Sequence, residues 1–270
     1  MESVTDDPQP VRVEADGAQL EAPADQAVAA VLQEDEQVER VWTAEDFGDS
    51  DWDHPDTRPA LRGFLHQWAF VGAIVAGAVL VPLASVQGLR AGLSTALYCL
   101  IICGLFGISA LYHRRRWGPR GWKVMKRLDH SMIFLFIAGT YTPFALLAVS
   151  DPTGYWILGI VWTAAIGGVA LKMPWPTAPR WLGVPLYVGL GWVAVFVLTD
   201  ILHIAGVASL VLLAAGGLLY TAGGIAYAIK KPNPWPGVFG YHEVFHAMTI
   251  VAAICHYIAV YFAVYRSPFL

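Results

Sequence analysis

The chain has 270 residues, of which 56% are hydrophobic and only 14% are charged. Soluble domains usually contain about 45–50% apolar and about 25% charged residues. Because a single soluble core cannot bury this much apolar surface, the composition argues against a soluble globular protein and favours an integral membrane protein.

Charge divides the sequence into two parts. Residues 1–57 contain 17 acidic and 2 basic residues, whereas residues 58–270 contain 4 acidic and 15 basic ones. The first part has little to bury and is predicted to be an acidic, disordered cytoplasmic tail. A cleavable signal peptide is not expected, because Met1 opens this tail and not a basic segment followed by an apolar one. Residues 58–270 are predicted to form one membrane domain.

Seven apolar runs of about 18–25 residues follow the tail, and each is long enough to cross about 30 Å of hydrocarbon as a helix. They are Phe64–Val86, Ala91–Tyr112, Leu128–Val149, Gly154–Leu171, Leu182–Leu202, Gly206–Ile229 and Tyr241–Tyr265. The sequence therefore predicts an all-α membrane protein, a bundle of seven transmembrane helices. The many Gly and Ala residues in these runs suit close helix packing in lipid.

The linkers predict the orientation of this bundle, because Lys and Arg concentrate in cytoplasmic loops. Thirteen basic residues lie before the first span or after the second, fourth and sixth: Arg58, Arg62, Arg114, Arg115, Arg116, Arg120, Lys123, Lys126, Arg127, Lys172, Arg180, Lys230 and Lys231. The opposite side has only Arg90 and Arg266. The N-terminus is thus predicted to be cytoplasmic and the C-terminus outside, in a multi-pass protein of the plasma membrane.

The partners expected from this charge pattern are membrane lipids. The basic residues border the inner leaflet, where anionic lipids are their natural neighbours, and no nucleic acid is expected. The three cysteines, Cys99, Cys103 and Cys255, lie inside apolar runs and are interpreted as small buried hydrophobic residues. The oligomeric state is left open.

Ionisable side chains inside membrane spans are costly, so each is a functional candidate. His113 ends the second span, Asp129 opens the third, and His242 and His246 open the seventh. The predicted topology brings all these ends to the cytoplasmic face. Residues that are far apart in the sequence are therefore expected to share one depth in the membrane.

The spacing of these residues predicts a metal site. His242 and His246 are four residues apart and project from one helix face, and a catalytic zinc ion typically has three protein ligands. His113 would be the third ligand. Asp129 and Ser109, which lies four residues before His113, would orient a ligand or water. A cluster of neutral histidines without metal is the alternative.

The segment from His242 to His246 also matches the H-E-x-x-H pattern of zinc proteases, in which the glutamate is the general base. Five residues with three fixed positions are a weak signal. The alternative is that Glu243 lies on a partly solvated helix face, where an acid in the first turn also favours the helix dipole.

Together these motifs resemble the hemolysin III family, the bacterial branch of the progestin and adipoQ receptor (PAQR) superfamily, over about Leu61 to Val264. The segments that carry the resemblance are Ser109-Ala-Leu-Tyr-His113, Arg127-Leu-Asp129-His-Ser-Met-Ile-Phe, Ala138-Gly-Thr-Tyr-Thr-Pro143, Tyr241-His242-Glu-Val-Phe-His246 and Cys255-His256. The resemblance implies a seven-helix fold with the N-terminus inside.

The resemblance also implies a zinc ion held by His113, His242 and His246, with Asp129 beside its water and Ser109 lining the site. The family position of Glu243 is not a zinc ligand, which argues against a protease. One departure stands out, since many relatives open the first span with a Glu, Asn, Thr-His motif. Here the stretch runs Pro59-Ala-Leu-Arg62-Gly-Phe-Leu-His66, which keeps the histidine but neither the acid nor the amide.

Besides a membrane metalloprotease that would use Glu243, two classes of function follow from the sequence. The first is a zinc-dependent hydrolase of lipid amides, with a ceramide-like substrate suggested by related receptors and ceramidases, in which Asp129 would take a proton from water. The second is a non-enzymatic membrane-homeostasis, receptor-like or hemolysin-like protein with structural zinc. A pore ranks low, because the polar groups cluster at one face and only His256 and Asp200 hint at a deeper path.

Overall fold

Helices account for the regular structure of the described part of this chain. The computed structural model describes residues 59–175 and 179–269, so the predicted tail, residues 1–57, lies outside it. The helices are α3 (Phe64–Gln87), α4 (Leu89–Arg114), α5 (Pro119–Leu147), α6 (Thr153–Lys172), α7 (Arg180–Gly191), the 3-10 helix η2 (Trp192–Val197), α8 (Leu198–Ile229) and α9 (Tyr241–Arg266). The all-helical prediction is confirmed over these ranges.

The outer surface of the bundle is suited to lipid. Six helical stretches in the described residues are long and apolar enough to cross a membrane. Large apolar side chains on them remain exposed in the folded chain, with Val75 at 60%, Leu100 at 70% and Trp156 at 72%. Exposed apolar surface on this scale is unfavourable in water, whereas hydrocarbon accepts it without cost.

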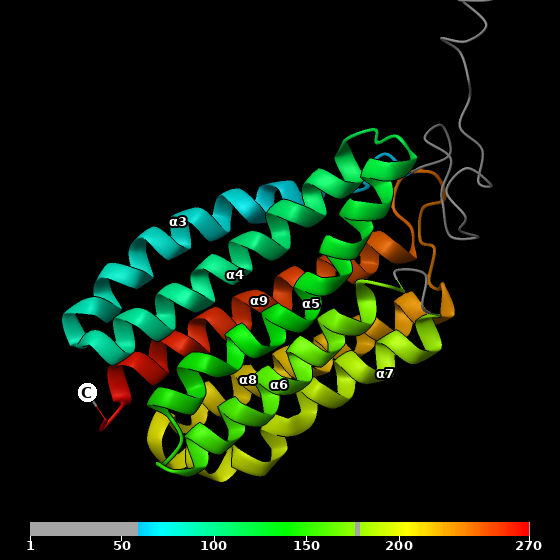
Figure 1. The fold of residues 1–270 in the computed structure, drawn as a ribbon. Coiled ribbons are helices and arrows are strands. Elements are labelled where there is room, and N and C mark those ends of the chain that lie inside the picture. The colour runs from blue at the N-terminus through cyan, green and yellow to red at the C-terminus, as the bar shows by residue number, and fades with distance from the viewer. Residues whose placement is uncertain (1–58, 176–178, 270) are drawn as a thin grey trace, which may run out of the picture. The chain divides into compact units, whose positions relative to one another are not determined.

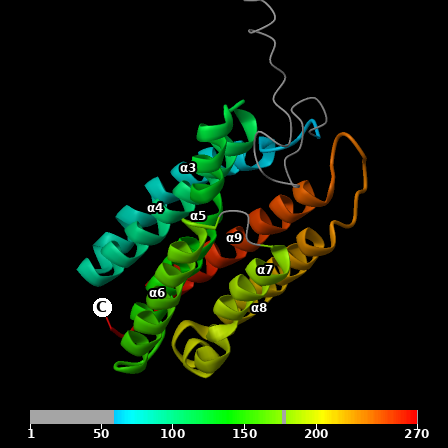
Figure 2. The same ribbon diagram turned by 45° about the vertical axis from the view of Figure 1, so that its right-hand side comes forward.

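Helix α9 lies in the middle of the bundle, where it packs against α3, α5 and α8. Figures 1 and 2 both show the red α9 between the cyan pair α3 and α4 and the yellow α8. Around it, α3 packs on α4, α4 on α5 and α5 on α6. Side chains on α9 can therefore meet residues from several other helices.

The predicted fifth and sixth spans occur together in one helical stretch of 50 residues, Arg180–Ile229. Gly206 interrupts it, with φ of 85° and ψ of 172°, a conformation that glycine adopts readily because it has no Cβ. Gly224 follows this break in the chain, and it packs against Val184 and Val188, which come before the break. The segments on the two sides of Gly206 therefore lie side by side, and Figure 1 shows the yellow ribbon turning back.

Tyr141 of α5 supports the point where α7 tightens into η2. Its hydroxyl donates to the Gly191 carbonyl at 2.7 Å and accepts from the Ala194 amide at 2.6 Å. A change of helix type leaves backbone groups without their usual partners, and membrane hydrocarbon offers none. The phenol supplies these partners and ties this segment to α5.

The helix that contains the third predicted span starts earlier in the chain than that span. Helix α5 begins at Pro119 and not near Leu128, so Asp129 lies well inside a helix and does not open it. Proline is favourable in the first helical turn. The following Lys and Arg residues are good helix formers, so the helix continues beyond the apolar window that defines the span in the sequence.

A buried ion pair fixes the beginning of α9. The Arg62 Nε donates to Glu243 Oε1 at 2.6 Å, and these side chains are only 9% and 0% exposed. The other carboxylate oxygen of Glu243 accepts the Gly240 amide at 2.9 Å, just before the helix. Asn233 Oδ1 accepts the Tyr241 amide at 2.9 Å. Glu243 thus caps its own helix and joins it to the segment that leads into α3.

Removing one partner of this pair should destabilise the fold strongly, because it leaves the other charge buried and unpaired. We expect Arg62→Met to lower the free energy of unfolding by about 3–5 kcal/mol, measured by denaturant titration in detergent micelles. The matched control is Arg90→Met, because Arg90 forms an exposed pair with Asp151 and should cost no more than about 1 kcal/mol. Equal losses in the two variants would contradict a structural role for the buried pair.

Candidate metal centre

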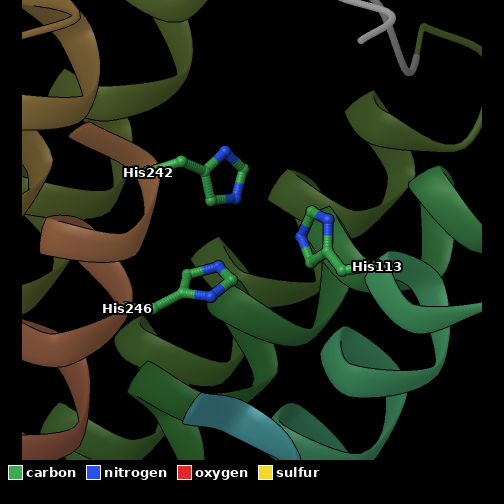
Figure 3. Close-up of side chains that lie close together, drawn as sticks. All are labelled: His113, His242 and His246. Atoms are coloured by element: carbon green, nitrogen blue, oxygen red, sulfur yellow. The ribbon is translucent and has the colours of Figure 1, made fainter. Parts of the chain in front are cut away.

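Three histidines from two helices meet at one end of the bundle. His113 lies in the last turn of α4, and His242 and His246 lie in the first two turns of α9. One nitrogen from each ring lies within 4.8 Å of the others. The ring centroids are 4.6–5.2 Å apart, and Figure 3 shows the three rings turned toward a common point. The predicted histidine cluster is confirmed.

The geometry and chemistry of this cluster fit a zinc ion. Zinc–nitrogen distances of about 2.0–2.1 Å in a tetrahedral site place the ligand atoms about 3.3–3.4 Å apart, so small rotations of the rings would complete it. The His246 Nδ1 is buried and has no hydrogen-bond partner among the described residues. A neutral imidazole offers one ring nitrogen to a metal and keeps a proton on the other, and three such rings are a donor set that zinc accepts, with a fourth position left for water.

The start of α3 packs directly against the backbone of His113. Gly63 has φ of 74°, and a Cβ at this position would lie 2.7 Å from the His113 Cβ. Glycine is therefore required both by the left-handed backbone and by the close approach. This contact sets the end of α4, while the Arg62–Glu243 pair next to it sets the start of α9.

Asp129 and Ser109 also meet beside the histidines. Their side chains share a hydrogen bond, and both residues line the same cavity as the three rings. Ser109 comes from α4 and Asp129 from α5. The two residues that the sequence singles out as candidate catalytic groups are thus brought together, and their roles remain predictions.

His66 is a fourth imidazole at this site. Its ring stacks on His246 with centroids 3.7 Å apart and an interplanar angle of 12°, and it meets the Phe106 ring edge-on at 5.1 Å. His66 is buried and lies outside the group of three whose ligand atoms converge. Its main contact with the site is therefore the His246 ring, which it holds in place by stacking.

The geometry gives Glu243 a structural role. Both of its carboxylate oxygens are engaged, one by Arg62 and one by the Gly240 amide. The side chain is fully buried, which corrects the expectation of a partly solvated helix face, and Glu243 is not among the residues lining the cavity. A carboxylate in this position is poorly placed to activate water for a protease, whereas its predicted contribution as an acid in the first turn agrees with the cap that it forms.

A cavity of about 360 Å³ leads from the histidines into the bundle. It touches α5 from Lys126 to Ala145 and reaches Ile157 of α6 and Ile201 of α8. Beyond the polar end the lining is mainly aromatic and aliphatic, with His256 as a deeper polar residue. Small-molecule sites are typically apolar cavities of about 300–1,000 Å³ with a few convergent polar groups, and this cavity has that character.

The deeper polar residues of the sequence do not form a path across the bundle. The His256 ring lies 3.4 Å from the Leu213 carbonyl and packs edge-on against Tyr220. Asp200 accepts hydrogen bonds from the amide and hydroxyl of Ser150 and is not among the cavity-lining residues. These contacts are local, so they lend no support to a pore.

Three basic residues of this cavity were missed as site residues by sequence reasoning. Lys126, Lys172 and Arg180 line the cavity, whereas their positions in the sequence indicated only loop charges that report orientation. Arg62 was missed as the partner of Glu243 for the same reason. No pattern in the sequence separates a basic side chain that turns into the bundle from one that turns toward lipid head groups.

The sequence is similar to known membrane proteins over most of the membrane domain. The sequence model of the Haemolysin-III related family matches residues 56–257. Hemolysin-3 of Bacillus cereus is 32% identical over 166 residues, which cover 60% of this chain and 75% of that protein. The heptahelical transmembrane protein ADIPOR2 of Oryza sativa subsp. japonica is 29% identical over 180 residues, 61% of this chain and 76% of that one.

A human protein extends the similarity along the chain. The monocyte to macrophage differentiation factor of Homo sapiens is 25% identical over 213 residues, 77% of this chain and 85% of that protein. The family match covers most of the membrane body and includes all three histidines of the cluster. This chain therefore belongs to the haemolysin III-related family, a group of multi-pass membrane proteins within the PAQR superfamily.

Proposed function

We propose that this protein is a zinc-dependent hydrolase that cleaves an acyl bond of a membrane lipid, with an amide as the first candidate. One observation carries the proposal: three histidine nitrogens within 4.8 Å of one another border an apolar cavity inside a membrane protein. A purely structural metal site needs no such cavity. A lipid hydrolase needs both a metal-binding group and space for an acyl chain.

His113, His242 and His246 would hold the zinc ion. When bound, zinc supplies Lewis acidity, which lowers the pKa of water toward about 7 and polarises a carbonyl group. The three rings come from helix ends that the Arg62–Glu243 pair and Gly63 fix in place. They are thus preorganised, which limits the reorganisation that the reaction requires.

Asp129 would act as the general base and then as the general acid. As the oxygen of a water molecule bonds to the carbonyl carbon, the carboxylate accepts the proton that the water loses. The carbon–nitrogen bond then breaks, and Asp129 returns this proton to the leaving nitrogen. Ser109, through its hydrogen bond to Asp129, would hold the carboxylate in the orientation that both transfers need.

The apolar part of the cavity would accommodate the acyl chain. From Asp129 to Ala145 the cavity follows α5 for about 24 Å, at a rise of about 1.5 Å per residue. A straight chain laid along this path would have its carbonyl end beside Asp129 and the histidines. This placement would bring the scissile bond to the polar end of the cavity without moving the helices.

We further propose that the chain crosses the membrane seven times, with the N-terminus in the cytoplasm and the C-terminus outside. Support comes from Gly206, which breaks the 50-residue stretch, and from the packing of Gly224 against Val184. Two antiparallel crossings fit these contacts better than one. The name of the rice relative, a heptahelical transmembrane protein, agrees with this count.

Thiol labelling in intact cells tests this topology. In a background with Cys99, Cys103 and Cys255 replaced by Ala, we expect Met173→Cys and Lys231→Cys to be protected from an impermeant reagent. Ser267→Cys should react from outside, and permeabilisation should expose the first two. If Met173→Cys and Lys231→Cys reacted from opposite sides, the stretch between them would cross only once and the seven-span proposal would fail.

Metal analysis tests the zinc site. The purified protein should contain about one zinc ion per chain, by elemental analysis after extensive dialysis. His113→Ala, His242→Ala and His246→Ala should each lose most of it, because a site with two protein ligands binds zinc weakly. His203→Ala, at an exposed histidine remote from the cluster, is the control and should keep full zinc content. Undiminished zinc in all three cluster variants would refute the site.

Activity measurements test the role of Asp129. With a panel of acyl lipids in detergent or nanodiscs, Asp129→Asn should retain zinc but release fatty acid about 10²–10⁴-fold more slowly. Glu243→Gln weakens the pair that positions the histidines, so it should lose some activity per folded molecule but far less than Asp129→Asn, whereas a protease that used Glu243 would lose its activity entirely. If wild type and His246→Ala gave the same background release over the whole panel, the hydrolase would be excluded, and bound zinc would then favour the structural alternative.

A further inference from the structure

Three basic side chains from three helices converge on the polar end of the cavity. Lys126 comes from α5, Lys172 is the last residue of α6, and Arg180 is the first of α7. All three line the cavity that also contains Asp129 and His242. They are close enough that Lys172 and Arg180 both act electrostatically on Lys126, and Arg180 also acts on His242.

This cluster places several like charges where water is scarce. Lys126 is 6% exposed and Lys172 is 3% exposed. Burial penalises each charge, and mutual repulsion adds to the penalty. Among residues 59–175 and 179–269, three of the four acids have partners elsewhere: Glu243 with Arg62, Asp151 with Arg90 and Asp200 with Ser150. Asp129 is the one acid of this part of the chain that lines the cavity, so within these ranges three basic side chains and one acid border its polar end.

Aromatic rings and a glycine position the three side chains. The Lys126 ammonium lies 4.7 Å from the centroid of the Trp122 ring, and the Arg180 guanidinium lies 4.4 Å from that of Tyr227. The Lys172 Nζ lies 3.5 Å from the position that a Cβ on Gly183 would take, so this ammonium is in van der Waals reach of the first turn of α7. Cation–π contacts of this kind orient a cation without neutralising its charge.

We propose that Lys126, Lys172 and Arg180 form the head-group site for an anionic acyl lipid whose chain lies in the cavity. That this lipid is a substrate rests on the proposed hydrolase, whereas its binding to the three basic residues does not. The head group would be a phosphate or a comparable oxyanion, because guanidinium and ammonium groups donate charge-assisted hydrogen bonds to its oxygens. The substrate class then narrows from acyl lipids in general to acyl lipids whose polar half is anionic.

The position of the cluster also predicts which half of the substrate it holds. Along α5 the cavity-lining residues run from Lys126 through Asp129 to Ala145, so Asp129 lies between the basic end and the apolar part. A lipid with its chain in the apolar part and its carbonyl beside Asp129 would have its polar leaving half beside the lysines. On hydrolysis the fatty acid would remain in the apolar part, and the anionic half would leave from the basic end.

Equilibrium binding of two matched lipids tests the head-group site. The full-length protein is reconstituted in phosphatidylcholine nanodiscs, and binding of radiolabelled 1-oleoyl lysophosphatidic acid is compared with that of 1-oleoylglycerol, which has the same chain and no phosphate. Measurements are made in the His246→Ala background so that no turnover intervenes. We expect the phosphate lipid to bind at least about tenfold more tightly, since hydrogen bonds to charged groups are among the stronger ones.

Charge variants identify the residues responsible. Lys172→Gln and Lys126→Gln should each reduce the preference for the phosphate lipid by about tenfold and leave 1-oleoylglycerol binding unchanged. Lys172→Arg keeps the charge and should keep most of the preference, which separates loss of charge from loss of folding. Lys123→Gln is the matched control, because Lys123 lies one turn before Lys126 on α5, is exposed and is not among the cavity-lining residues.

The head-group site and the hydrolase can fail independently in these experiments. A preference for the phosphate lipid that survives both Gln variants would overturn the head-group site, whatever the enzyme hydrolyses. Inorganic phosphate that bound without competing with the lipid would also overturn it, because the oxyanion site would then not be part of a lipid site. A preference lost in the Gln variants of a protein that hydrolyses no lipid would support the head-group site while the hydrolase failed.

Discussion

The ion pair between Arg62 and Glu243 joins the two ends of the membrane domain at the site. Its residues are 181 positions apart, and the carboxylate also caps α9, the helix that carries two of the three clustered histidines. A buried charge pair is held to one geometry because either charge alone would be strongly unfavourable there. His242 and His246 flank Glu243 on the same helix, so whatever fixes Glu243 also fixes them.

The same pair gives a physical meaning to the departure at the start of the first span. The family resemblance predicts an acid and an amide before the histidine, whereas this chain has Arg62, which reaches Glu243. His66, which is kept, stacks on His246. The segment before α3 therefore still supports the histidine cluster, although it does so through a guanidinium and a stacked ring.

Polar and apolar groups are separated along the cavity. The histidines, Asp129 and the three basic residues gather at one end of a cavity whose remaining walls are mainly apolar. Hydrocarbon penalises polar groups, so they are tolerated only where other protein groups, a ligand or a cation partner them. An amphiphile with one polar end and one apolar chain matches this division, and for this reason the proposals for the metal, the acyl chain and the head group all concern one lipid.

Apolar length, charge counts and helical spacing in the sequence were sufficient to predict the membrane class, the all-helical fold and the meeting of His113, His242 and His246. These features depend on spacing along one helix and on the thickness of a bilayer, both of which are fixed before the chain folds. Only the tertiary structure decided three other features. They are the start of α5 at Pro119, the Arg62–Glu243 pair and the inward turn of Lys126 and Lys172. They depend on which side chains face each other across helices, and a basic residue near a span end has the same sequence signature whether it faces lipid or a cavity.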